Sequence, residues 1–342
     1  MRFELTDEQR GFASSLDDLL GAAETTTVAR AWAAGEHETG LKLWKRLANL
    51  GVHGLCIPES AGGLGATALD VVVAFEQLGR HLAPGPYIES VALAPALLAA
   101  AGAPTSDRLA SMSVGTTIIT LAVPPHTPYA LDADIATSTL LLGGSRLTEL
   151  TEAAVGPLHR SVDASRRLFS VTRGDDVATL DPTVVEGAMD FAVLACTAQL
   201  LGAGERLLTE TVEYAKARTQ FGRPIGQFQA LKHAMADVRV ALDFARPLVY
   251  GAALSAGSAD GSRDVSAAKV AVGDAAYSAS RVALQVHGAI GYTAEHDLGL
   301  AITKVRALFN AWGTASLHRA RVLASLVERP ESTPEPTVTK EA

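Results

Sequence analysis

The chain has 342 residues, of which 48% are apolar, 19% charged and only 5% aromatic, and its formal net charge at pH 7 is −8. This composition excludes a disordered chain and favours helices packed on helices around a sizeable core. The acidic balance, without a long run of Lys or Arg, excludes nucleic acid as the main partner, although one anionic cofactor needs only a few local cations.

The first predicted unit is helical and covers residues 1–105. Thr6 and Gln9 stand three residues apart in the pattern of a capping box, which predicts a helix that begins after Thr6. Further helices are predicted where apolar residues recur at helical spacing: over residues 41–50, over 69–80, and from the Pro-rich turn at 84–86 to about Ala101.

A β-rich unit is predicted over residues 106–183. Runs of β-branched or continuously apolar residues that are bounded by Pro and Gly are typical of strands. Three such runs occur, at residues 116–123, 138–142 and 167–171. We therefore expect a small, shortened middle domain of β-strands.

From about Val185 the pattern is helical again, which predicts a C-terminal helical bundle over residues 184–328. Breaks between its helices are expected at residues 222–224, 257–264 and 288–295. One apolar stripe marks the buried face of its second helix, with Leu231, Ala234, Met235, Val238, Ala241, Leu242 and Ala245. The Pro-rich residues 329–342 are expected to be a disordered tail. The predicted fold class is mostly α with a small β domain.

The sequence carries no signal for export or for a membrane. No positively charged, apolar leader follows Met1, and the most apolar stretch, residues 91–101, is much shorter than a membrane span. Cys56 and Cys196 lie among apolar residues and favour buried, reduced thiols. We therefore expect a cytoplasmic protein that does not bind a membrane.

Two motifs of the bundle carry a resemblance to a known family. Residues 218–229 read Arg-Thr-Gln-Phe-Gly-Arg-Pro-Ile-Gly-Gln-Phe-Gln, and residues 285–293 read Gln-Val-His-Gly-Ala-Ile-Gly-Tyr-Thr. Together with the order of helical unit, β unit and helical bundle, they resemble the acyl-CoA dehydrogenase family over roughly the whole chain. The resemblance implies an N-terminal helical domain, a middle β domain, a C-terminal four-helix bundle, FAD as cofactor and an acyl-CoA substrate.

The resemblance also implies which residues contact the adenosine and pyrophosphate of FAD. Arg218 is the expected phosphate clamp, because a guanidinium is always charged and can fork two hydrogen bonds onto pyrophosphate oxygens. Phe221 and Phe228 can lie against adenine or flavin, and Gly288 and Gly291 let the backbone approach a ligand closely. The expected cofactor-binding residues are Arg218, Gln220, Phe221, Phe228, Gln229, Gln285, Gly288, Ala289 and Gly291.

The catalytic base of the family is missing from this sequence. The family's reaction needs a carboxylate that takes the α-proton of the thioester, usually a Glu in a Tyr-Glu-Gly-Thr segment. Here Trp312 stands at that position, and an indole cannot accept the proton. The alternative position, on the helix before Arg218, is Ala192, and Asp190 would point away from it by about 200°. We therefore predict no catalytic residue.

The remaining ionisable residues receive ordinary structural interpretations. Glu205, Glu210 and Glu213 are expected to be solvated or ion-paired carboxylates on a helix. His233 and His287 have no Cys, Asp or second His at metal-ligand spacing, so they are expected to be structural histidines and no metal is predicted.

The middle unit contains neither the Glu-Pro-x-x-Gly-Ser-Asp nor the Trp-x-Thr-Asn stretch with which family members hold the isoalloxazine ring. What remains resembles the shorter subunit of the heterotetrameric (α2β2) acyl-CoA dehydrogenases that actinobacteria use on sterol side chains. The resemblance implies a non-catalytic subunit, inactive alone, that shares FAD with a second acyl-CoA dehydrogenase subunit. Steroid side-chain CoA esters are the candidate substrates, and an electron-transfer flavoprotein is a candidate partner.

Two alternatives stay open. A self-sufficient homomeric acyl-CoA dehydrogenase with an atypical base would be yellow when expressed alone and would bleach with some acyl-CoA. A flavin-free CoA-ester-binding or scaffold protein would stay colourless with every partner.

Overall fold

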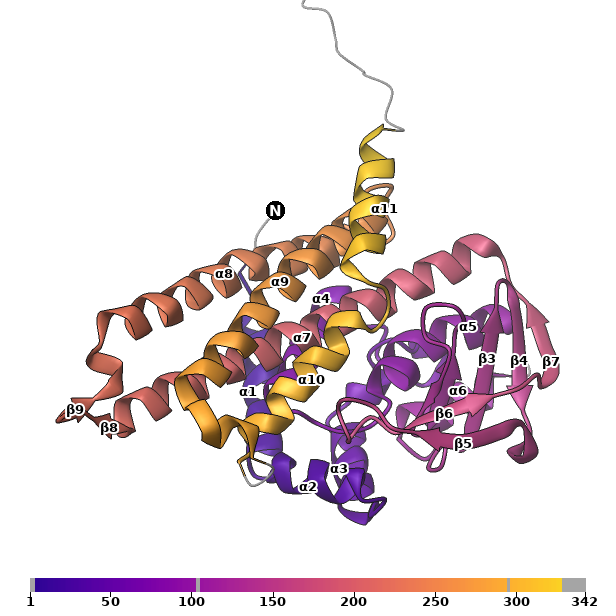
Figure 1. The fold of residues 1–342 in the computed structure, drawn as a ribbon. Coiled ribbons are helices and arrows are strands. Elements are labelled where there is room, and N and C mark those ends of the chain that lie inside the picture. Colours follow the sequence, from indigo (N-terminus) through magenta and orange to yellow (C-terminus); the bar gives the residue numbers. More distant parts are fainter. Residues whose placement is uncertain (1–3, 103–104, 294–295, 328–342) are drawn as a thin grey trace, which may run out of the picture.

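The computed structural model describes residues 4–102, 105–293 and 296–327. A set of helices, a β-rich unit and a bundle of long helices follow one another along the chain (Figure 1). In the view of Figure 1 the β unit lies at one side of the molecule, and the long helices extend away from it. The predicted fold class is confirmed.

The N-terminal region is built from short helices around an apolar interior. Thr6 Oγ1 accepts a hydrogen bond from Gln9 N at 3.2 Å, and Thr6 N donates to Gln9 Oε1 at 3.1 Å, which confirms the predicted capping box. The helices are α1 (Asp7–Gly21), α2 (Thr25–Ala33), α3 (Glu38–Asn49), α4 (Ala68–Arg80) and α5 (Ala94–Ala101), with 3-10 turns at Val52–Gly54 and Glu59–Ala61 and a π-helical segment at Ile88–Leu93.

The β unit follows helix α6 (Ser106–Ser113), which occupies the first residues of the expected middle domain. One sheet has the strand order β1-β3-β4-β7, in which β1 and β3 are parallel, and a second has the order β2-β6-β5. The strands are β1 (Ile119–Ala122), β2 (Ala130–Leu131), β3 (Ser138–Gly143), β4 (Arg146–Leu150), β5 (Val155–His159), β6 (Leu168–Val171) and β7 (Asp175–Thr179), with a 3-10 turn at Glu152–Ala154. The three predicted strands correspond to β1, β3 and β6.

The bundle contains α7 (Pro182–Ala217), α8 (Gln229–Leu254), α9 (Gly261–His287), α10 (Leu298–Asn310) and α11 (Ala315–Val327), with a hairpin of β8 (Thr219–Gln220) and β9 (Arg223–Pro224) and 3-10 turns at Ile225–Gln227 and Gly288–Tyr292. Helix α9 already begins at Gly261, so the predicted break at residues 257–264 was too long. The predicted stripe on α8 is confirmed, with Met235, Val238, Leu242 and Ala245 buried.

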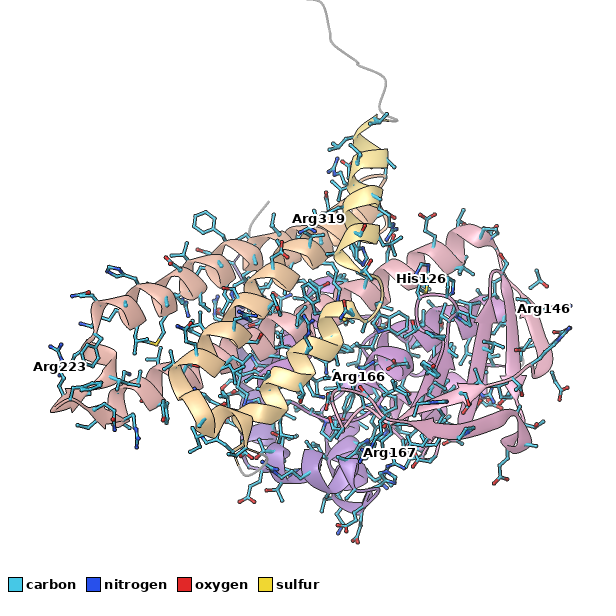
Figure 2. The ribbon with its side chains drawn as sticks, viewed as in Figure 1. His126, Arg146, Arg166, Arg167, Arg223 and Arg319 are labelled. Carbon is cyan, nitrogen blue, oxygen red and sulfur yellow. The ribbon has the colours of Figure 1, made fainter. Side chains whose placement is uncertain are left out.

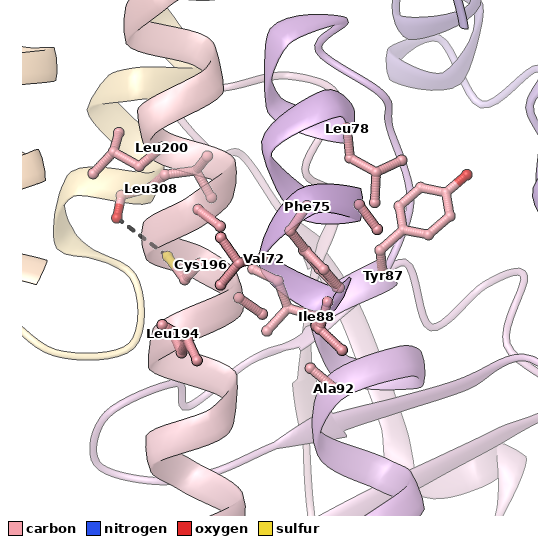
Figure 3. Close-up of a cluster of buried hydrophobic side chains, with 14 of the residues drawn as sticks. Val72, Phe75, Leu78, Tyr87, Ile88, Ala92, Leu194, Cys196, Leu200 and Leu308 are labelled. Atoms are coloured by element: carbon pink, nitrogen blue, oxygen red, sulfur yellow. Dashed lines mark hydrogen bonds between the residues drawn. The ribbon is translucent and has the colours of Figure 1, made fainter. Parts of the chain in front are cut away.

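Helix α7 is the central helix of the core. Figure 3 shows its residues Leu194, Cys196 and Leu200 beside Val72 and Phe75 of α4. The two backbones meet at glycines: a Cβ on Gly202 would lie 1.9 Å from the carbonyl oxygen of Glu76, and one on Gly79 would lie 1.9 Å from that of Gln199. Small residues at the crossing let the helices approach each other closely.

By length and composition alone, α7 could also cross a membrane, and it is the one such helix in the described residues. Most of its apolar stretch is buried inside the protein, as expected for a core helix. In the sequence this helix is less conspicuous than residues 91–101, because small and polar residues interrupt its apolar ones.

A group of four charges, with two buried carboxylates and two partly exposed guanidinium groups, joins α4, α7 and α8. Arg246 donates hydrogen bonds to Glu76 and Glu205, and Arg80 also contacts both carboxylates. Glu205 was expected to be solvated or ion-paired, and the structure shows the second with the carboxylate almost fully buried. Glu210 and Glu213 make helical ion pairs with Arg206 and Lys216.

Candidate functional site

The first motif forms the β8–β9 hairpin between α7 and α8. Arg218 ends α7 with its N–H donating to Tyr214 O at 2.8 Å, and its carbonyl accepts from Ile225 N at 2.8 Å. The turn residues Phe221 and Gly222 both have positive φ, 53° and 78°. This is the backbone of a two-residue hairpin turn, which Gly adopts without strain but Phe does not.

The hairpin presents its side chains to solvent. Phe221 is 92% exposed, and Arg218, Gln220 and Gln229 are exposed as well. Among the residues that the structure describes, the Arg218 guanidinium makes no ion pair or side-chain hydrogen bond. The rings of Phe221 and Phe228 form a T-shaped pair with their centroids 6.2 Å apart. Arg223, which was not among the predicted site residues, places its guanidinium carbon 4.3 Å from the centroid of the Phe228 ring.

The second motif forms the last turn of α9 and the 3-10 turn after it. Gln285, Gly288 and Ala289 are exposed, and Gly288 has φ 61° with open space where a Cβ would stand. Gly291 is buried instead, since a Cβ there would lie 3.2 Å from Leu284 and 3.3 Å from His287. A backbone contact from Gly291 to a ligand stays a prediction.

A ring stack brings the two motifs together at one end of the bundle. Tyr214, one helical turn before Arg218, stacks on His287 with ring centroids 4.1 Å apart and an interplanar angle of 23°. His287 Nδ1 lies 2.8 Å from the Ala283 carbonyl oxygen, which confirms its structural role, and burial lowers the pKa of the imidazole. The stack could not be predicted from the sequence, because the two residues are 73 positions apart.

The donor set at this end fits the adenosine and pyrophosphate of a dinucleotide. Arg218 offers a forked cation, the side chains of Gln220, Gln229 and Gln285 offer amides, and Phe221 offers an uncovered aromatic face. An exposed guanidinium without a carboxylate partner is free to bind an anion. Figure 2 shows Arg223 at this end of the bundle and His126 on the other side of the view, beside the β unit.

A second candidate location is a cavity of about 360 Å³ between the β unit, α7 and α11. Its wall is mainly apolar and includes Pro124, Pro125, Met189, Val193, Trp312 and Leu317. Trp312 is 1% exposed, has φ 60°, and its indole Nε1 has no hydrogen-bond partner in the described structure. His318 Nε2 lies 3.1 Å from the Trp312 carbonyl oxygen, and burial, with the Lys269 charge, lowers the His318 pKa to about 4.

The carboxylates near this cavity are not free to act as a buried base. Ala192 is fully buried in α7 and carries no carboxylate. Asp190 does border the cavity, but it accepts hydrogen bonds from Arg321, at 2.7 Å, and from Ser262. Glu186, which the sequence analysis missed, lies on the cavity rim with its side chain 64% exposed.

Donors for an isoalloxazine ring are few in the wall of the cavity. Flavin is held through hydrogen-bond donors at its ring nitrogens and carbonyl oxygens, and Pro124 and Pro125 have no N–H, although the Trp312 indole N–H has no other partner among the described residues. The guanidinium of Arg321 already binds Asp190. No group of three or more His, Cys, Asp or Glu side chains in the described parts of the chain could hold a metal ion.

Comparison with known proteins gives the same family in both helical regions. Residues 6–106 match the model of the acyl-CoA dehydrogenase N-terminal domain, and residues 183–327 match that of the acyl-CoA dehydrogenase C-terminal domain. The acyl-CoA dehydrogenase IpdE2 of Mycobacterium tuberculosis is 34% identical over 86% of this chain and 89% of its own length.

Solved structures resemble the whole chain. The ChsE4–ChsE5 complex from Mycobacterium tuberculosis contains a chain that is 25% identical, with a TM-score of 0.85 over 96% of this chain and 100% of that one. A variant of the steroid ACAD Tcur3481–Tcur3483 has the same fold, with 23% identity and a TM-score of 0.85 over 94% of this chain and 98% of that one.

Proposed function

Because the chain belongs to the acyl-CoA dehydrogenase family, we propose that it is a non-catalytic subunit that completes the FAD site of a second acyl-CoA dehydrogenase subunit. The proposal rests on one observation. Arg218, Phe221 and Gln285, which suit the adenosine and pyrophosphate of FAD, are exposed at the end of the bundle, whereas the carboxylates that border the cavity beside Trp312 are either paired, as Asp190 is with Arg321, or exposed, as Glu186 is.

In this arrangement FAD, when bound, supplies the hydride acceptor for the dehydrogenation. The part of this chain is to bind and orient the cofactor. Arg218 would hold the pyrophosphate, Gln285 would donate its amide to the same end of the dinucleotide, and Phe221 would cover an aromatic surface. The partner subunit would supply the carboxylate that takes the α-proton and the pocket for the isoalloxazine ring.

A heterotetramer is the assembly that this division of roles favours. An exposed half-site needs a second polypeptide to enclose the ligand, and the chain resembles a member of the ChsE4–ChsE5 complex. CoA esters of steroid side chains are the proposed substrates, by analogy with the steroid ACAD that shares the fold. An electron-transfer flavoprotein is the proposed acceptor of the electrons.

A self-sufficient dehydrogenase is the second candidate, and Glu186 is the residue that favours it. Its carboxylate borders the cavity and lies 3.8 Å from Arg321.

Changing Trp312→Glu restores a carboxylate at the usual position of the base but adds no ring donors. We therefore expect the Trp312→Glu chain to remain inactive alone, and dehydrogenation by this variant would contradict our interpretation of the cavity.

Co-expression tests the proposed function. The chain is purified alone and after co-expression with a candidate second acyl-CoA dehydrogenase subunit, and flavin per polypeptide and acyl-CoA oxidation are measured. We expect flavin and activity only in the co-purified complex. Stoichiometric flavin and thioester oxidation by the chain alone would refute the proposal, and a colourless, inactive complex would favour a scaffold.

The role of Arg218 has a matched control on α8. A charge-assisted hydrogen bond contributes about 1.5–3 kcal/mol, so Arg218→Ala should weaken FAD binding by the complex roughly 10- to 150-fold. Arg239 is also exposed but pairs with Asp243 on α8, so Arg239→Ala should leave FAD binding unchanged. Equal FAD affinity in the two variants would show that Arg218 is not a phosphate clamp.

A further inference from the structure

A lysine and a cysteine touch in the core, outside both locations described above. Lys269 of α9 is 3% exposed and Cys196 of α7 is fully buried. Lys269 Nζ lies 3.2 Å from Cys196 Sγ and donates a hydrogen bond to the Leu308 carbonyl oxygen of α10 at 2.7 Å. Figure 3 shows Cys196 on α7 facing Leu308.

Packing alone does not explain this lysine. Within the described residues no carboxylate lies within 4.0 Å of Lys269 Nζ, so the amine has only a carbonyl oxygen and a sulfur as partners. Burying an ammonium group without a counter-charge is costly, and an apolar side chain of similar length would avoid that cost. The Cys196 sulfur is the side-chain atom that this amine contacts.

The sulfur also lies close to the cavity beside Trp312. Val193, one helical turn before Cys196, lines that cavity. Cys196 Sγ is 3.9 Å from the carbonyl oxygen of Ala311, the residue before the cavity-lining Trp312. Because Cys196 is fully buried, its oxidation requires peroxide to reach the sulfur from the side of this cavity.

We propose that Cys196 and Lys269 form an oxidative modification site, at which hydrogen peroxide joins the two side chains through a covalent sulfur–nitrogen bond. The thiolate attacks one peroxide oxygen, so that the O–O bond breaks, hydroxide leaves and the sulfur is oxidised to a sulfenic acid. The hydroxide takes a proton from the Lys269 ammonium and becomes water.

In the second step the neutral amine attacks the sulfur. The S–N bond forms, the S–O bond breaks, and the departing hydroxide leaves as a second water with a proton from the nitrogen. The overall reaction consumes one thiol, one amine and one hydrogen peroxide and gives one sulfenamide and two waters. The nitrogen keeps one hydrogen, which can still donate to the Leu308 carbonyl oxygen. The product ties α7 to α9.

Mass spectrometry on the full-length chain tests this proposal, in complex with any partner with which it co-purifies. A Cys56→Ser background removes the other cysteine, so that no intramolecular disulfide can form. After peroxide treatment and denaturation without reductant, we expect a mass loss of two hydrogen atoms, a tryptic species that joins the peptides of Cys196 and Lys269, and reversal by dithiothreitol.

Lys269→Met in the same background is the matched control, because it keeps the stem length without the amine, and it should gain only oxygen atoms on Cys196. Three results would overturn the proposal: addition of oxygen to Cys196 without loss of hydrogen in the lysine-containing chain, a free Cys196 thiol after treatment, or the same loss of hydrogen in the Lys269→Met chain. The first two are read from the lysine-containing chain alone, so the test does not depend on folding of the variant.

Discussion

Replacing Arg246 with methionine should destabilise the fold strongly. The guanidinium donates to Glu76 Oε1 at 2.6 Å and also to Glu205, and these carboxylate side chains are only 7% and 8% exposed. Methionine retains an apolar stem but leaves the two buried carboxylates with Arg80 as their shared cation. Removing one partner of a buried ion pair costs about 3–5 kcal/mol, and we expect a loss in this range at neutral pH.

The loss should also grow with pH. In the native chain, burial raises the pKa of Glu76 even with Arg246 beside it. A carboxyl group whose pKa is raised in the folded state stabilises the fold while it is protonated, and this contribution is lost as pH rises through the folded-state pKa. Without Arg246 the raising effect is larger. The difference in unfolding free energy between variant and wild type should therefore be larger at about pH 8 than at about pH 5.

Urea unfolding followed by circular dichroism measures this difference. Arg239→Met is the matched control on the same helix, because Arg239 pairs with Asp243 at 2.8 Å with both side chains exposed, 62% and 45%. An exposed pair contributes at most about 1 kcal/mol. Equal losses for the two variants, or a smaller loss for Arg246→Met at high pH than at low pH, would refute the reasoning.

Three further predictions concern the helix crossing at Gly202, the buried carboxyl group of Asp132 and the stack of Tyr214 on His287. Gly202→Ala should destabilise the chain by roughly 1–3 kcal/mol in urea unfolding, because the new Cβ would lie 1.9 Å from the Glu76 carbonyl oxygen. Gly187→Ala is the matched control: it has open space around its Cβ and should stabilise the chain by about 0.5–1 kcal/mol. Burial raises the pKa of the Asp132 carboxyl group to about 7. The protonated group therefore stabilises the fold at acidic pH, and this contribution is lost as pH rises through about 7. In thermal melts, the melting temperature of Asp132→Asn should fall less than that of the wild type over this pH range. Tyr214→Leu removes the stack that joins the two motifs and should weaken FAD binding by the complex roughly 2- to 13-fold in titrations, with unchanged affinity as the contrary result.

Local signals predicted the long helices of the bundle and the strands β1, β3 and β6. The Thr6–Gln9 capping box and the apolar stripe of α8 are local patterns, and both occur as expected. Strands β5 and β7 were missed because they are mostly exposed edge strands whose residues lack a continuous apolar run. Strands β2 and β4 were missed although most of their residues are buried, because β2 has only two residues and β4 mixes polar and apolar ones. Their pairing depends on contacts with the rest of the sheet, which a local pattern does not contain.

The candidate site was predictable in its residues but not in its geometry. The two motifs identify Arg218 and Gln285, whereas the stack of Tyr214 on His287 that joins them depends on how α7 and α9 cross. In the same way the sequence predicts that Trp312 stands where the family's base would lie, but the positive φ of Trp312 and the apolar cavity beside it appear only in the fold.

The backbone strain and exposure of the hairpin support the binding role that we propose for this motif. A non-glycine residue in the left-handed region costs of order 1–3 kcal/mol, and Phe221 adopts it at φ 53° while 92% of the residue is exposed. Its ring buries little surface that could offset this strain within the chain. A strained, exposed aromatic residue beside an unpaired Arg218 therefore adds little to the stability of the isolated chain, and a bound aromatic anion gives both residues a physical role.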